Sequence, residues 1–160
     1  MAGLDRCRAC SAKLIEGPDV QRQGASERFS VKVDGIPTKV CPSGCDVSYW
    51  YWPDFGVEVL DALTRSTGGV ARRRLGFRKT RHLCRQCGTE LEDHGDRGTF
   101  LAKGRLRKGS DLNISIEAPC LTCPGCGAKS MPAQTSTHDP YYVELASLLG
   151  ETVSEGLDRG

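Results

Sequence analysis

Cysteine is the residue type whose number and spacing in this sequence point most directly to chemistry. The chain has nine cysteines in 160 residues, and they fall in groups whose neighbouring members are separated by two or three residues. Thiolates in such turns are ligands for zinc or partners in thiol redox reactions. Four groups in two matching sets favour metal binding. The last group is a triple, Cys120, Cys123 and Cys126, so the rest of the chain must indicate which two of its sulfurs bind.

The two halves of the chain repeat one pattern. The first half contains VKVDGIPTKVCPSGC and the second ISIEAPCLTCPGC, each with alternating β-branched residues and a proline four residues before a cysteine. Downstream, FGVEVLDAL at 55–63 aligns without gaps to YYVELASLL at 141–149. In this alignment Cys120 falls opposite Thr38, which is no metal ligand. Self-similarity of this kind defines the architecture of a chain.

The repeat assigns the metal ligands. The loops between paired groups have 30 and 35 residues, which suit a hairpin that returns the second pair to the first. Zinc takes four such ligands in a tetrahedron. The spare Cys120 is expected as a small buried hydrophobe; the alternatives are exchange with Cys126 or a sensing thiol. Two structural zinc ions per chain are therefore expected, one on Cys7, Cys10, Cys41 and Cys45 and one on Cys84, Cys87, Cys123 and Cys126.

The fold expected around these sites is a small metal-stabilised α+β fold of two tandem zinc ribbons. Each ribbon is a β-hairpin with two zinc knuckles, followed by a short α-helix. Hydrophobic residues make up 38% of the chain and aromatic residues 6%, so a metal must support the sparse core. Strands are expected at Phe29–Val33, Gly98–Leu106 and Asn113–Glu117, and helices near 53–67 and from Asp139 to Gly150. The predicted divisions are a first ribbon at 1–66, a basic linker at 67–82, a second ribbon at 83–150 and a disordered tail at 151–160.

Several classes of protein are excluded by what the sequence lacks. The start MAGLDRCRACSAKL has no apolar run typical of a signal peptide, and no segment is apolar enough to span a membrane, so we expect a cytoplasmic location. A zinc deaminase needs a ligand and a glutamate ahead of PCxxC, but the nearest candidate is His94-Gly95-Asp96. A site closed by four cysteines also leaves no position for water. We therefore expect no enzyme and no small-molecule substrate, and surface positions for His82, His94 and His138.

The first repeat resembles the YgiT-type zinc finger, the N-terminal zinc-binding domain of MqsA-type antitoxins. The family pattern is CPxCG, a strand pair ending in V-x-G-V/I-P-x-x-x-C-x-x-C-G, and a helix. The chain departs from it in three ways: Ser11 follows Cys10 in place of glycine, CPSGC is one residue longer than the usual knuckle, and a second ribbon replaces the helix-turn-helix domain. The resemblance, over 7–65 and more weakly over 84–150, implies a zinc ribbon and suggests an antitoxin-like role. The residues that fit the central part are Val33, Gly35, Ile36, Pro37, Cys41 and Cys45.

Two further surfaces bear on partners. Residues 67–111 carry twelve basic and five acidic side chains, a surplus of +7 that would suit nucleic-acid phosphates or an acidic protein, or would simply be solvated. The run Tyr49, Trp50, Tyr51 and Trp52 would place one aromatic pair on the ribbon core and expose the other to an interface, unless the following helix covers both. The basic candidates for nucleic-acid binding, in segments 72–82 and 103–108, are Arg72, Arg73, Arg74, Arg78, Lys79, Arg81, Lys103, Arg105, Arg107 and Lys108.

The function expected from these features is a non-enzymatic zinc-binding adaptor that binds a partner protein in the manner of an antitoxin or immunity protein. The alternative is a nucleic-acid-binding zinc ribbon protein associated with transcription or translation. The two classes differ in how binding depends on salt, because binding to phosphates weakens steeply as salt rises.

Overall fold

A computed structural model gives the fold of the chain. It describes residues 5–50, 70–73, 80–105, 111–134, 138–154 and 158–159. Across these ranges the protein is a small α+β structure of mostly antiparallel sheets with one helix, α2 (Pro140–Ser154). The helix predicted near 53–67 lies outside the described residues.

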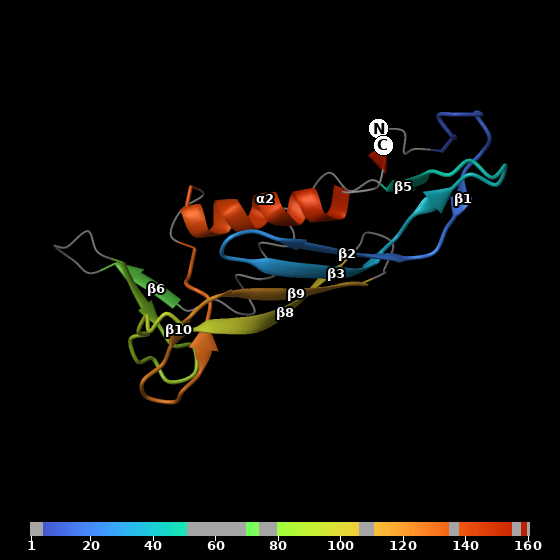
Figure 1. Cartoon of the computed structure of the whole chain (residues 1–160). Helices are drawn as coiled ribbons and strands as arrows, with labels where there is room; N and C mark the ends of the chain where they lie inside the picture. Colours follow the sequence, from blue (N-terminus) through green and yellow to red (C-terminus); the bar gives the residue numbers. More distant parts are fainter. Residues whose placement is uncertain are drawn as a thin grey trace.

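The central sheet has the strand order β2-β3-β9-β8 and contains both repeats (Figure 1). Hairpins β2 (Val20–Ala25)–β3 (Ser30–Ile36) and β8 (Arg97–Arg105)–β9 (Asp111–Pro119) correspond to the strand pairs expected for each repeat. The structure differs from two separate ribbons because β3 pairs antiparallel with β9 and makes one sheet of them. A two-stranded hairpin is at best marginally stable in water, whereas four strands share one apolar face and one core.

Side chains of this sheet alternate between a core face and an open face. Val31 and Val33 on β3, with Ile114 and Ile116 on β9, are buried on the face that α2 covers. The other buried residues of this core lie on the strands of the sheet, in the segments that flank strands, and on α2: Phe29, Ile36, Phe100, Ala102, Leu112, Ala118, Cys120, Met131, Tyr142, Leu145, Leu148, Leu149 and Val153.

A bulge in β3 determines how the strands of the two repeats align. Val20 pairs with Ile36 and Arg22 with Val33, so β3 has one extra residue in this interval. Gly35 lies there with a φ of 83°, a conformation that glycine adopts without a steric cost. The gapless match of the two proline–cysteine spacings therefore holds only on the C-terminal side of Gly35.

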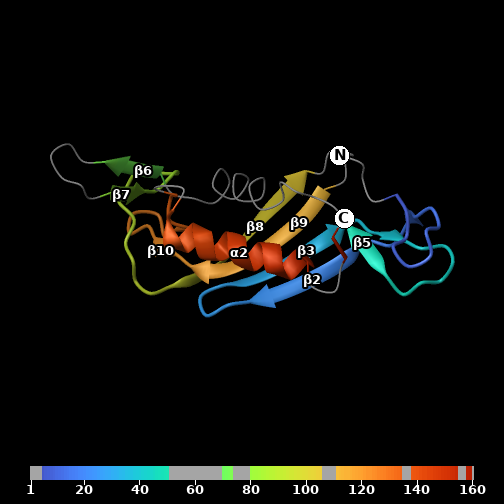
Figure 2. The same cartoon turned by 90° about the horizontal axis from the view of Figure 1, so that it is seen from above.

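Helix α2 begins as the sequence predicts and ends later. The Asp139 side chain accepts a hydrogen bond from the Tyr141 N–H at 3.1 Å, which is an N-cap, and Pro140 is the first helical residue. Gly150 does not stop the helix, because the next turn buries Thr152 and Val153 against the sheet. The helix of the second repeat covers β2 and β3 of the first, so the repeats are interleaved (Figure 2).

Small sheets stand at the two ends of the central one (Figure 1). At one end β1 (Ile15–Glu16), β4 (Lys39–Val40), β5 (Ser48–Trp50) and β12 (Asp158–Arg159) form a sheet in that order. At the other end are the pairs β6 (Val70–Arg73)–β7 (Thr80–Leu83) and β10 (Leu121–Thr122)–β11 (Lys129–Ser130).

Two predicted segments differ from their expected character. The predicted linker 67–82 contains β6 and most of β7, which pair from Val70↔Leu83 to Arg73↔Thr80. The predicted disordered tail instead completes α2 and supplies β12, which pairs in parallel with β5. Packing of the last helical turn and backbone pairing with β5 order a segment that its composition alone does not.

Candidate metal centres

The first centre lies at the β1–β4–β5 end of the molecule. Its four sulfurs all lie within 4.8 Å of one another, and the Cys10 and Cys41 Sγ atoms are 3.4 Å apart. Cys7 and Cys41 are buried and Cys10 is exposed. The structure thus brings together the set predicted from the spacing: Cys7, Cys10, Cys41 and Cys45.

The second centre lies at the β6–β7 and β10–β11 end. Its four sulfurs also lie within 4.8 Å of one another, with Sγ–Sγ separations of 3.7 Å between Cys84 and Cys126 and 3.4 Å between Cys87 and Cys123. Two of its cysteines, Cys87 and Cys126, are exposed. Here too the structure gathers the predicted set, Cys84, Cys87, Cys123 and Cys126.

Three of the four cysteine turns share one backbone design. The N–H of the first cysteine donates to the carbonyl five residues on, and the N–H four residues on donates back to the first cysteine carbonyl, at 2.8–2.9 Å throughout. The residue that makes the returning bond has a positive φ. It is a glycine in the second centre and a serine in the first: Gly88 at 74°, Gly127 at 76° and Ser11 at 62°.

The fourth turn, Cys41-Pro-Ser-Gly-Cys45, has one more residue and a different closure. Its Gly44 N–H donates to the Cys41 carbonyl at 3.3 Å, and Gly44 has a φ of 86°. The extra residue that departs from the family pattern is therefore accommodated by a glycine in the left-handed region. Each of the four turns presents two sulfurs to its own centre, so two turns make up each centre.

The distances between sulfurs fit a metal ion better than a disulfide. All nine cysteines are free thiols. Separations of 3.4–3.7 Å are far beyond the S–S bond of about 2.05 Å. They are near the value of about 3.8 Å that a tetrahedron with metal–sulfur bonds of about 2.3 Å requires. Each of the two four-cysteine groups can therefore hold one metal ion.

The thiols of each four-cysteine group differ in pKa. The backbone hydrogen bond from Cys10 chiefly lowers the pKa of Cys7 to about 6, and hydrogen bonds from Thr89 chiefly lower the pKa of Cys87 to about 6. Cys45 has its pKa raised to about 12, chiefly by hydrogen bonds with Cys10 and Cys41. The pKa of Cys126 in the second group is likewise raised, to about 11. A bound cation would favour the thiolate form of the four sulfurs in each group.

Tyr49 seals the first centre from the side of β5. Its side chain is 1% exposed, and its hydroxyl accepts a hydrogen bond from the Arg8 N–H at 3.2 Å and lies 3.8 Å from the Cys7 Sγ. Of the four aromatic residues predicted at a partner interface, this one lies in the core beside the metal ligands. Trp50 lies in β5, and Tyr51 and Trp52 are outside the described residues. Sequence reasoning missed this contact with the centre, because Tyr49 and Cys7 are 42 residues apart.

Cys120 belongs to the central core and to neither metal group. It is 3% exposed, and burial chiefly raises the pKa of its thiol. The triple therefore divides as the repeat predicts, with Cys123 and Cys126 in the second centre and Cys120 in the core as a small hydrophobe. The histidines lie apart from both groups: His82 accepts a hydrogen bond from the Ala133 N–H at 3.2 Å, and His94 contacts Glu92 at 2.7 Å.

The predicted basic residues that the structure describes lie on three strands, β6, β7 and β8. Arg72 and Arg73 lie in β6 and Arg81 in β7, where Arg72 is directly opposite Arg81. The Arg81 guanidinium forms an ion pair with Glu90 at 2.6 Å. Lys103 is exposed on β8 and Arg105 ends that strand. The remaining candidates lie outside the described residues: Arg74, Arg78, Lys79, Arg107 and Lys108.

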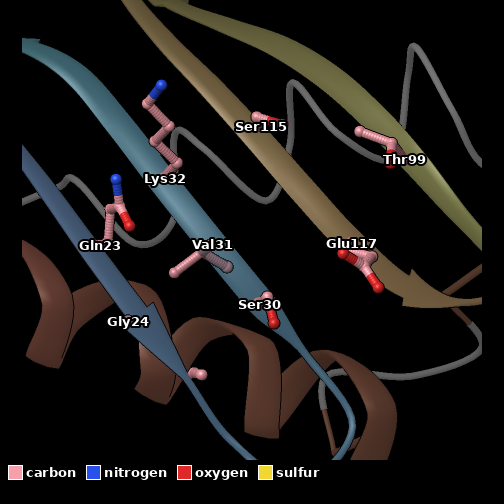
Figure 3. A pocket seen from close by; sticks show the side chains of 9 residues that line it. Gln23, Gly24, Ser30, Val31, Lys32, Thr99, Ser115 and Glu117 are labelled. Atoms are coloured by element: carbon pink, nitrogen blue, oxygen red, sulfur yellow. The ribbon is translucent and has the colours of Figure 1, made fainter.

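The open face of the central sheet is mainly polar, with Leu101 of β8 as an exposed apolar residue on it. Figure 3 shows Lys32, Ser115, Thr99 and Glu117 on three neighbouring strands, where they line a shallow hollow of about 560 Å³. This face is opposite α2 and crosses the junction of the two repeats. It gives the molecule a broad hydrogen-bonding surface between its two metal centres.

Comparisons with known proteins add no relative to this description. No family model, no curated protein and no solved structure matches the chain. Within the described ranges, no helix combines the length and the apolar composition needed to cross a membrane. The resemblance to YgiT-type zinc fingers therefore stays a prediction from the sequence motifs of 7–65 and 84–150.

Proposed function

We propose that both four-cysteine centres hold structural zinc. Thiolate sulfur is a preferred ligand of Zn²⁺, and four cysteines complete its tetrahedral shell with no position left for water. Purified protein is expected to contain two zinc ions per chain by elemental analysis. Replacement by Co²⁺ is expected to give the absorption bands of tetrahedral cobalt thiolate, and a protein purified with iron in place of zinc would contradict the assignment.

We propose further that the protein is a non-enzymatic, cytoplasmic adaptor that binds a partner protein, in the manner of an antitoxin or immunity protein. The observation that carries this proposal is the single sheet between the two centres. It joins both repeats through β3 and β9, is backed by α2, and leaves its other face polar and open. Metal-clamped ends and a shared core make a rigid surface, and rigid surfaces lose little entropy on association.

The test is purification of the tagged protein from its own host, with and without nuclease, followed by mass spectrometry. A single stoichiometric protein that remains after nuclease treatment is the expected result. The matched variant Cys41→Ser removes a ligand of the first centre, so its loss of the same partner would link binding to the metal. Recovery of no protein partner under any condition would refute the adaptor.

The second candidate is binding of nucleic acid, which the β6–β7 hairpin favours. Its register places three basic positions on one short element, since Arg72 and Arg73 lie on β6 and Arg81 lies directly opposite Arg72 on β7. A concentration of basic residues of this kind suits nucleic-acid phosphates. Binding to generic RNA or DNA that weakens linearly in a log–log plot against salt, and that is lost in Arg72→Glu, would favour this function over the adaptor.

A further inference from the structure

The two edge strands of the central sheet differ as templates for pairing. β2 has six residues, faces a bulge in β3 and is closely covered by α2 at Gly24. β8 has nine residues, and all nine pair with β9 in unbroken register. Among the described residues, β9 is the only strand that pairs with β8, so the other edge of β8 has no paired strand there. A long, regular edge strand offers an ordered row of backbone donors and acceptors.

The side chains of β8 on the open face combine an apolar centre with cations. Leu101, at the middle of the strand, is 72% exposed, more than any other large hydrophobic residue of the described ranges. Lys103 is exposed and forms no ion pair with the described residues. Arg97 forms an ion pair with Glu117, with 3.4 Å between Nε and Oε1. Period-two alternation places these three residues on one face.

The charge of β8 opposes pairing with a second copy of itself. In an antiparallel pair centred on Leu101, position 97 of one copy would lie opposite position 105 of the other. Both positions are arginine, so two like-charged pairs would face each other, and Lys103 would add a cation beside them. A strand with this charge pattern selects a partner of opposite charge.

We propose that β8 is the docking edge for an extended acidic segment of the partner protein, which adds to the sheet as a fifth, antiparallel strand. The proposal rests on the adaptor function proposed above. An apolar side chain of the segment covers Leu101, and carboxylates lie opposite Arg97 and Lys103. Backbone hydrogen bonds along the edge supply affinity, and the alternating side chains supply selectivity. Antiparallel addition continues the direction of every pairing in this sheet.

The probe is a synthetic nonapeptide with blocked ends, Glu-Thr-Glu-Val-Ile-Val-Thr-Thr-Glu. Its three glutamates fall opposite positions 105, 103 and 97, and its isoleucine falls opposite Leu101. The control peptide has lysine in place of the three glutamates. Titration into isotope-labelled, zinc-loaded protein is followed by amide chemical shifts and hydrogen exchange. We expect alternate amides of Arg97–Arg105 to gain protection with the acidic peptide and not with the lysine peptide.

Two variants sharpen the test. Lys103→Glu is expected to raise the Kd of the acidic peptide about tenfold, because an attractive cross-strand pair becomes repulsive. Lys13→Glu makes the same charge change at an exposed site after the first cysteine turn, away from β8, and is expected to leave the Kd unchanged. Equal effects of both variants, equal binding of both peptides, protection outside β8, or no binding at 1 mM peptide would overturn the proposal.

The host complex separates this proposal from the adaptor function. If the copurified partner remains bound to Lys103→Glu as tightly as to the original protein, docking on β8 is wrong and the adaptor stands. If the variant loses the partner and Lys13→Glu retains it, both proposals are supported. If no protein partner copurifies with the original chain, the adaptor fails, and with it the role assigned to β8.

Discussion

Lys32 and Ser115 lie directly opposite each other across β3 and β9, and they are equivalent positions of the two repeats. The equivalence follows from the buried residues on either side, because Val31 and Val33 match Ile114 and Ile116 once the Gly35 bulge is allowed for. Val31 is equivalent to Ile114 but pairs with Ile116 in the sheet. Val33 is equivalent to Ile116 but pairs with Ile114. The two central strands are thus related by a local two-fold axis between Lys32 and Ser115.

This symmetry explains why the two repeats share one central core and have two separate four-cysteine groups. Antiparallel pairing about a two-fold axis places the ends of the two hairpins at opposite ends of the sheet. The cysteine turns that follow β3 and β9 therefore lie far from each other (Figure 1). A metal ion in each group would fasten the loops at its own end, while the sheet between them is common to both repeats.

The first prediction concerns the single serine at the shared left-handed position of the cysteine turns. Ser11→Gly should stabilise the first centre by about 1 kcal/mol, because a residue with a Cβ atom is strained at positive φ. Gly88→Ser makes the reverse change in the second centre and should destabilise it by a similar amount. Competition with a chromogenic chelator measures zinc retention at each centre. An unchanged or faster release of zinc in Ser11→Gly would show that the serine side chain has another role.

The second prediction concerns the hydroxyl of Tyr49. Tyr49→Phe keeps the ring that packs on the first centre but removes the hydrogen bond from the Arg8 N–H to the Tyr49 hydroxyl. A lost hydrogen bond of this kind costs about 1 kcal/mol, so zinc release from the first centre should quicken about fivefold. The second centre should release zinc at its original rate and serves as the internal control. Equal acceleration at both centres would mean that the substitution acts on the whole fold.

The third prediction separates ligands from the spare thiol. Cys41→Ser and Cys123→Ser should each lower the zinc content from two ions to one, while Cys120→Ser should retain both. Structural zinc sites contribute on the order of 10 kcal/mol, so each ligand variant should lose order at its own end of the sheet. Elemental analysis and amide exchange measure both effects. Loss of an ion from Cys120→Ser would show that this sulfur takes part in the second centre.

The amino-acid sequence predicted the local structure around the cysteines better than it predicted how the strands and the helix pack together. Spacing and the internal repeat together predicted both ligand sets, because each cysteine turn brings two sulfurs together and the repeat excludes Cys120. The Asp139 N-cap is encoded by adjacent residues. The pairing of β3 with β9 was not predictable, since an amphipathic strand such as Val31–Val33 fits any partner with a complementary apolar face. The order of 151–154 was missed for the same reason: it depends on Thr152 and Val153 meeting a distant strand.

The fourth prediction tests that distant contact. A Cβ atom at Gly24 would overlap the Thr152 Oγ1 atom, so β2 and α2 approach too closely for any side chain. Gly24→Ala should therefore lower the free energy of unfolding by about 1–3 kcal/mol, the usual cost of overpacking a core. Thermal denaturation of the zinc-loaded protein measures this loss.

Thr152→Ala provides the matched rescue for Gly24→Ala. It removes the hydroxyl and leaves the Cβ of residue 152 at 3.2 Å, a contact that a small shift relieves. The double variant should therefore be more stable than Gly24→Ala alone. Gly150→Ala is the control, because it lies in α2 where an added Cβ meets no atom within 4 Å. Gly150→Ala should not lower the free energy of unfolding, since alanine favours a helix more than glycine does. If Gly24→Ala were as stable as the original chain, the helix of the second repeat would not pack on the first, and the interleaved fold would be wrong.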